Sequence, residues 1–116
     1  MKRNVLLALM LLAFLFIGTS LFAANDTAEP QQLFKAHCAM CHGPDGAGNT
    51  FIGKKENIPN LRSSQVQNNT DQELSGIIEN GKQKMPAFKA QLKPEQIKDL
   101  VSYLRELAKS GAPAPK

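Results

Sequence analysis

The sequence Cys-Ala-Met-Cys-His at residues 38–42 restricts the possible folds and cofactors of this chain more than any other feature. Residues three and four apart on a helical turn share one face, so Cys38, Cys41 and His42 are expected to point the same way. The spacing C-x-x-C-H is typical of c-type haem attachment, with two thioether bonds to the porphyrin and a histidine nitrogen on the iron. The chain has only these two cysteines. We therefore predict one covalent haem c per chain.

Two other uses of the cysteine pair are disfavoured. A thioredoxin-like redox disulfide normally accompanies a βαβ pattern, which the sequence lacks, and would leave His42 without a role. A structural zinc site would have two thiols and one adjacent imidazole, an incomplete and strained tetrahedron. The glycine-rich residues 43–49 are no phosphate cradle, because no Gly-Lys-Ser/Thr and no strand accompany them. Their glycines would instead let the backbone approach a flat ligand closely.

Residues 1–24 read as an export signal: Lys2 and Arg3, an apolar run over 5–17, and then small residues. The alternative is an uncleaved anchor, because about 20 residues without a charge are enough to span a bilayer. A cleaved signal is favoured, and only an uncleaved segment would bring membrane contact. Either form exports the domain. A periplasmic location agrees with haem attachment outside the bacterial cytoplasm, where uncapped thiols tend to oxidise.

Residues 25–116 have room for one domain. At roughly 90 residues an apolar core is thin, and a covalent porphyrin would supply the missing volume. The net charge of the whole chain is +4, and the part after the export segment has twelve basic and ten acidic residues. No basic run with interleaved aromatic residues is present, so a nucleic-acid partner is not indicated.

Three helices and no strand are predicted, which makes the fold class all-α. The first covers about 30–38 and opens with Pro30, a residue favoured at the first helical position. The second begins at the capping box of Thr70 and Glu73 and ends near 80–81. The third covers about 94–109. The residues expected to be buried are Leu33, Phe34, Leu74, Ile77, Ile78, Ile97, Leu100, Val101, Leu104 and Ala108.

The iron of a haem needs a second axial ligand, for which His37, Met40 and Met85 are the candidates. His37 and Met40 are expected to point away from the face that holds the porphyrin. Met85 lies 43 residues beyond His42 on a predicted loop, and we predict it as the ligand. Histidine and methionine together close both axial positions and raise the haem potential. Such a site transfers electrons and does not bind oxygen.

Several segments together resemble a class I cytochrome c, in particular the short monohaem bacterial and algal type. They are residues 38–42, Pro59-Asn60-Leu61, the stretch 81–88 with its Met-Pro-Ala-Phe, and the closing helix with Ile97, Leu100, Tyr103 and Leu104. The resemblance implies crossing N- and C-terminal helices, with loops and a short middle helix wrapping the haem. It would bring Leu33 and Phe34 against Leu100, Tyr103 and Leu104.

The resemblance also implies a role for Pro59, whose carbonyl would accept a hydrogen bond from the free ring nitrogen of His42 and fix its tautomer. The predicted haem-binding set is then Cys38, Cys41, His42, Pro59 and Met85, with His42 and Met85 on the iron.

The function implied is one-electron transfer outside the cytoplasm, in a respiratory or photosynthetic chain, and not an enzymatic reaction. The alternatives are a haem peroxidase or ligand sensor with an open sixth position, or the small haem subunit of a larger oxidoreductase. Redox proteins are the expected partners. Lysines could steer an acidic partner or merely solvate the surface; they are Lys35, Lys82, Lys84, Lys89 and Lys93.

Overall fold

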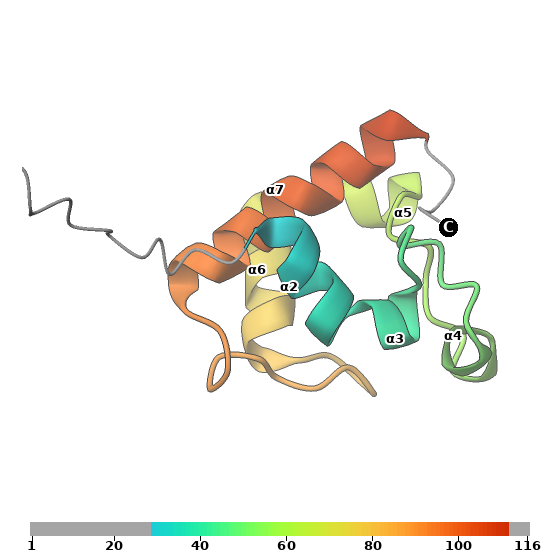
Figure 1. Ribbon diagram of the computed structural model, residues 1–116, viewed down its shortest axis with the longest axis horizontal. Helices are drawn as coiled ribbons and strands as arrows, with labels where there is room; N and C mark the ends of the chain where they lie inside the picture. Colours follow the sequence, from blue (N-terminus) through green and yellow to red (C-terminus); the bar gives the residue numbers. More distant parts are fainter. Residues whose placement is uncertain (1–28, 112–116) are drawn as a thin grey trace, which may run out of the picture.

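A computed structural model describes residues 29–111, and over that range the chain is all-α, as predicted (Figure 1). The described part contains no strand, although an isolated antiparallel bridge joins Lys82 and Met85. The export segment predicted at 1–24 lies outside the described residues. Within them, no helix has the length and apolarity to cross a membrane. The helices are α2 Pro30–His37, α3 Ala39–His42, α4 Phe51–Lys55, α5 Ser64–Gln67, α6 Asp71–Asn80 and α7 Pro94–Ser110.

Helix α2 begins at Pro30. Proline has no backbone N–H, so it leaves no unpaired donor in the first turn. The carbonyl of Glu29 accepts from the N–H groups of Gln32 and Leu33 at 2.8 and 3.1 Å. Leu33 and Phe34 are buried, as predicted. The helix ends at His37, and the Cys38 N–H donates to the Phe34 carbonyl at 2.8 Å. The haem-attachment motif therefore continues directly from a helix that is anchored in the core.

Helix α7 is the longest of the described helices, with 17 residues. The backbone N–H of Lys93 donates to the Gln96 side chain at 2.8 Å, and Gly111 ends the helix in a left-handed conformation. The predicted apolar stripe is buried at Ile97, Leu100, Val101 and Leu104, whereas Ala108 is only half-buried.

Helices α2 and α6 both pack on α7, and α2 crosses it in Figure 1. The rings of Phe34 and Tyr103 lie 5.4 Å apart, centre to centre, and are tilted by 58°. The predicted contact of the first and last helices is therefore confirmed. The buried core consists of Leu33, Phe34, Val66, Leu74, Ile78, Phe88, Leu92, Ile97, Leu100, Val101 and Leu104.

The capping box that opens α6 is formed as predicted. The Thr70 N–H donates to the Glu73 carboxylate at 2.7 Å, and the Glu73 N–H donates to the Thr70 hydroxyl at 3.2 Å. The Thr70 hydroxyl also donates to the Glu73 carboxylate, at 2.9 Å. The two bonds that the carboxylate accepts from Thr70 lower the pKa of Glu73 below its usual value. On the apolar face, Leu74 and Ile78 are buried, but Ile77 is only half-buried, unlike its prediction.

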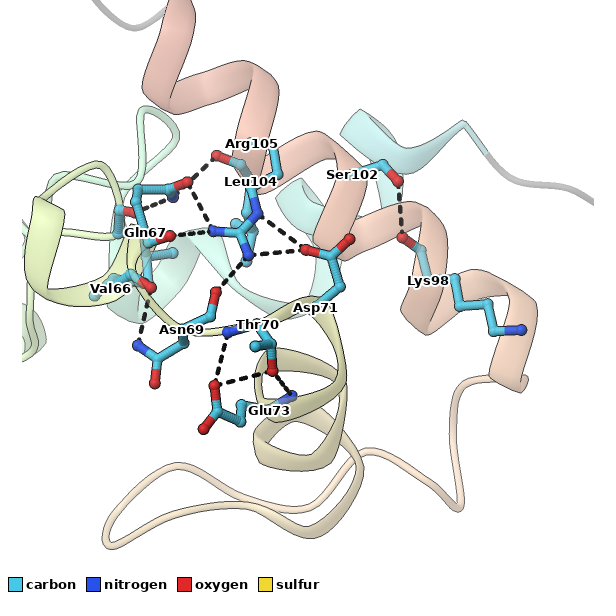
Figure 2. A network of polar contacts seen from close by, with 11 residues as sticks. Val66, Gln67, Asn69, Thr70, Asp71, Glu73, Lys98, Ser102, Leu104 and Arg105 are labelled. Atoms are coloured by element: carbon cyan, nitrogen blue, oxygen red, sulfur yellow. Dashed lines mark hydrogen bonds and ion pairs between the residues drawn. The ribbon is translucent and has the colours of Figure 1, made fainter.

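A network around Arg105 joins α7 to the segment between α5 and α6 (Figure 2). Its guanidinium donates to the Asp71 carboxylate at 2.8 and 3.1 Å and to the carbonyls of Gln67 and Asn69 at 2.8 and 2.6 Å. A further bond of 3.1 Å reaches the Gln67 side chain. The sequence pattern did not indicate this role, because the partners lie 34 to 38 residues away along the chain.

Two short helices were not predicted in the segment between the motif and α6. Helix α4 begins after Thr50, whose hydroxyl accepts from the Gly53 N–H at 2.8 Å. Helix α5 is a single turn that buries Val66. Each is so short that its apolar spacing is no more informative than that of a loop.

Candidate functional site: the haem-attachment motif and the Met85 loop

The attachment motif forms a single helical turn. The N–H groups of Cys41 and His42 both donate to the Cys38 carbonyl, at 3.1 and 2.9 Å. Cys38, Cys41 and His42 are half-buried, whereas the Met40 side chain is 73% exposed. Both cysteines are free thiols. Met40 therefore points away from the face of the three predicted haem-binding residues, as expected.

Burial sets the protonation of this turn. It raises the pKa of the Cys38 thiol to about 11, with a further contribution from the neighbouring Cys41. Burial also lowers the pKa of His42 below its usual value. At neutral pH Cys38 is therefore a thiol and His42 a neutral imidazole, the form in which histidine binds a metal.

The buried Nδ1 atom of His42 has no hydrogen-bond partner in the described part of the chain. Such atoms are rare in folded proteins and call for an explanation. An imidazole that binds iron through its other nitrogen carries its proton on Nδ1, so Nδ1 would still need an acceptor. The two free thiols and the His42 imidazole on one helical turn fit a covalently attached haem c.

Pro59, predicted as the acceptor for Nδ1, makes no hydrogen bond with it in the structure. Pro59 nevertheless lies near the motif, because Gly48 contacts both the motif and the backbone of residues 58–59. The Gly48 N–H donates to the His42 carbonyl at 2.7 Å, and a Cβ on Gly48 would lie 2.8 Å from the Ile58 carbonyl and 3.8 Å from that of Pro59. Only a glycine permits this approach, so Gly48 places the 58–59 backbone beside the turn that follows His42.

Thr50 and Gly53 both contact the backbone of the motif at the Cys41 carbonyl. Neither residue was identified from the sequence. The Thr50 hydroxyl donates to the Cys41 carbonyl at 2.8 Å and accepts from the Gly53 N–H. A Cβ on Gly53 would lie 2.1 Å from the Gly48 carbonyl oxygen and 2.8 Å from that of Cys41. Helix α4 therefore packs backbone to backbone on the haem-attachment turn. A threonine and a glycine three residues apart give too weak a signal to predict this.

Met85 lies at the end of a tight hairpin. The backbones of Lys82 and Met85 exchange two hydrogen bonds of 3.1 and 3.0 Å, and Gln83 between them has a positive φ of 55°. A Cβ on Gly81 would lie 2.5 Å from the Met85 carbonyl oxygen, so the turn requires a glycine there. Met85 is half-buried and packs against the core.

The loop after Met85 returns to the helical core. Phe88 is buried, and its N–H donates to the Ile78 carbonyl at 3.0 Å. The ring of His37 meets that of Phe88 edge-on, with 6.0 Å between their centres. His37 thus packs on this loop.

The five lysines considered either for partner docking or as ordinary surface cations differ in their contacts. Lys84 forms an ion pair with Glu56, the residue that ends α4. The Lys89 ammonium lies 3.3 Å from the Asn80 side-chain oxygen. All five predicted lysines, Lys35, Lys82, Lys84, Lys89 and Lys93, are exposed.

Comparison with known proteins places these features in context. Residues 25–104 match the family described as cytochrome c oxidase, cbb3-type, subunit III. A cytochrome c6-like protein of Nostoc sp. (strain PCC 7120) is 31% identical over 108 residues, covering 90% of this chain and 95% of that protein. Cytochrome c6 of the same organism is 32% identical and is covered to 86%, as is this chain.

A similar structure has also been solved. The KustC0563 c-type cytochrome superposes with a TM-score of 0.64 at 29% identity, over 69% of this chain and 98% of that one. The residues matched by the family model, 25–104, include the attachment motif and Met85.

Proposed function

Since the chain belongs to the monohaem class I cytochrome c family, as a cytochrome c6-like electron carrier, we propose that it carries single electrons between redox proteins outside the cytoplasm. A haem c is the redox centre of such a protein. We assign its attachment to Cys38 and Cys41 and its axial ligation to His42 and Met85.

The observation that carries this proposal is that the two predicted ligand segments pack on one core. Cys38 and Met85 are both partly buried against the same apolar cluster, although 47 residues separate them in the sequence. Helix α2 leads from this cluster into the attachment turn, and Phe88 anchors the Met85 loop to it. A rigid core that carries both ligands holds them in place when the charge of the site changes by one electron.

The protein's own groups have distinct roles in this proposal. The neutral His42 imidazole offers a ring nitrogen to the iron, while its buried Nδ1 is left for an acceptor. We propose that the Pro59 carbonyl becomes that acceptor, since Gly48 already brings this backbone close. Such an acceptor fixes the tautomer and raises the basicity of the ligand. Met85 would be the second ligand of the iron and would keep water from it.

Partners would dock where charge and apolar surface are both available. Lys82 and Lys89 are exposed on the Met85 loop and could steer an acidic partner. Met40, within the attachment turn, and Phe51, nine residues after it, are 73% and 83% exposed. Redox encounters bury little area, so such a mixed surface is sufficient. The export signal predicted at 1–24 supports a periplasmic site of action.

A second candidate is the haem subunit of a larger oxidoreductase, and the family match over 25–104 favours it. The two roles share the haem site and differ in assembly. Purification without detergent as a monomer supports the carrier, whereas stable copurification with integral membrane subunits supports the oxidoreductase.

Met85→Ala tests the ligand assignment. The variant should keep its covalent haem on a denaturing gel, lose the thioether-to-iron absorption band of the oxidised protein, and bind carbon monoxide when reduced. Met40→Ala is the matched control, because that methionine is exposed beside the cysteines, and its spectrum should equal that of the wild type. A Met85→Ala protein with an unchanged spectrum would refute the assignment.

A further inference from the structure

The ion pair of Lys84 and Glu56 joins two segments that lie 28 residues apart in sequence. Lys84 directly precedes Met85, whereas Glu56 ends the helix that packs on the attachment turn. We propose that this pair is a clasp that holds the Met85 loop against the His42 side of the haem site. Both are positioning residues. The inference rests on the proposed function, because it takes Met85 as an iron ligand.

Glu56 belongs to a firmly held part of the molecule. Its N–H donates to the Ile52 carbonyl at 2.9 Å, and its side chain is only 20% exposed. Helix α4, which it ends, is fixed to the Cys41 carbonyl by the Thr50 hydroxyl and by the close approach of Gly53. A group bound to the Glu56 carboxylate is therefore tied to the backbone of the attachment motif.

Lys84 belongs to a segment that is less firmly held. Its side chain is 76% exposed, and Gln83 before it and Pro86 two residues after it are exposed as well. The hairpin of 82–85 is closed by two backbone bonds and then returns to the core at Phe88. Segments with few buried contacts open locally at much lower free energy than the whole fold. An added contact at Lys84 therefore acts mainly on the opening of the Met85 loop.

The clasp changes the role of Lys84 among the basic residues of the loop. Because Glu56 neutralises its charge, Lys84 contributes less to the positive electrostatic field that would steer an acidic partner than an unpaired surface lysine would. Exposed pairs add little to global stability. Removing this one should leave the unfolding midpoint almost unchanged while the loop opens more often.

Displacement of Met85 by imidazole in the ferric holoprotein measures this opening. Lys84→Gln and Glu56→Gln should each accelerate the displacement by about 2- to 5-fold, the range expected of a partly exposed ion pair. The double variant should be no faster than either single variant, because the same contact is lost. Lys84→Arg should retain a rate close to that of the wild type.

Lys82→Gln is the matched control, since it removes one positive charge from the same hairpin and Lys82 has no ion pair among the described residues. Its rate should equal that of the wild type. High salt should accelerate the wild type and leave Lys84→Gln unchanged. Hydrogen exchange at the Met85 N–H, bonded to the Lys82 carbonyl, should rise in the same variants by a similar factor.

Equal rates in Lys84→Gln, Lys82→Gln and the wild type would overturn the clasp, as would additive effects in the double variant. Failure of the ligand assignment looks different. If Met85 did not bind iron, the wild type itself would lack the thioether band and bind imidazole without a slow step. Hydrogen exchange at Met85 would then still report whether the ion pair restrains the loop.

Discussion

The three long helices and the segments that face the haem site are built in different ways. Helices α2, α6 and α7 meet through apolar side chains, with Phe34, Ile97, Leu100 and Val101 fully enclosed. Around the attachment turn, Gly48 and Gly53 bring backbone segments into contact, and Gly81 does the same within the Met85 hairpin. Side-chain packing stabilises the first region, whereas the second depends on close approach of backbone segments.

The two regions should therefore respond to mutation in different measurements. Damage to the helical region should lower the free energy of unfolding with little change in the haem spectrum of the protein that folds. Damage to the haem-facing region should reduce haem attachment or alter ligation.

Leu100→Ala tests the helical region most severely. The side chain is 1% exposed in the middle of α7, and truncation of a buried leucine leaves a cavity and costs about 2–5 kcal/mol. Denaturant unfolding of the holoprotein should show this loss, while the thioether band persists at low denaturant. Loss of the band without loss of stability would contradict the distinction between the two regions.

Gly53→Ala tests the haem-facing region. Its methyl group would lie 2.1 Å from the Gly48 carbonyl oxygen, so α4 must move away from the attachment turn, at a cost of about 1–3 kcal/mol. We expect a reduced yield of haem-stained protein and a weakened thioether band.

Gly76→Ala is the control for that change, because a Cβ there meets no atom within 4 Å. In the interior of α6 alanine should stabilise by about 0.5–1 kcal/mol relative to glycine. Equal haem yields in the two alanine variants would contradict the role given to Gly53.

Arg105→Ala removes the polar link between α7 and the 67–71 segment. Loss of several charge-assisted hydrogen bonds should cost about 2 kcal/mol, less than full burial would imply because the side chain is 23% exposed. Arg105→Lys should recover only part of this loss, since an ammonium lacks the planar fork of donors. Lys109→Ala, on the same helix, is the control in thermal unfolding.

Thr70→Ala should destabilise α6 by about 1 kcal/mol through loss of the N-cap.

The capping box of Thr70 and Glu73 also predicts an effect of pH on stability. The pKa of Glu73 is lowered in the folded protein. The stability that its carboxylate contributes is therefore complete above the pKa of the unfolded state and is lost as the pH falls through the pKa of the folded state. Thermal midpoints measured below neutral pH should therefore fall less steeply in Glu73→Gln than in the wild type. Parallel curves would contradict this.

Sequence reasoning succeeded where a local pattern has one physical meaning. Pro30, the Thr70 and Glu73 box, and the stripe from Ile97 to Leu104 each act within one or two turns, and each lies where it was predicted. The prediction failed for α4 and α5, whose few residues carry no clear period. It overestimated burial at Ile77 and Ala108, because periodicity identifies a face of a helix but not how much of it a neighbour covers.

For the site, the spacing of Cys38, Cys41 and His42 was sufficient to predict the attachment turn, because it is a local property of one helical turn. Met85 could be singled out by elimination. The folded structure was needed to show the contacts around them: the Thr50 bond to the Cys41 carbonyl, the close approach of Gly53, the Arg105 network, and the pairing of Lys84 with Glu56. Except for the Thr50 bond, these contacts join segments whose sequences do not indicate that they meet. Each contact depends on how the folded backbone places the two segments.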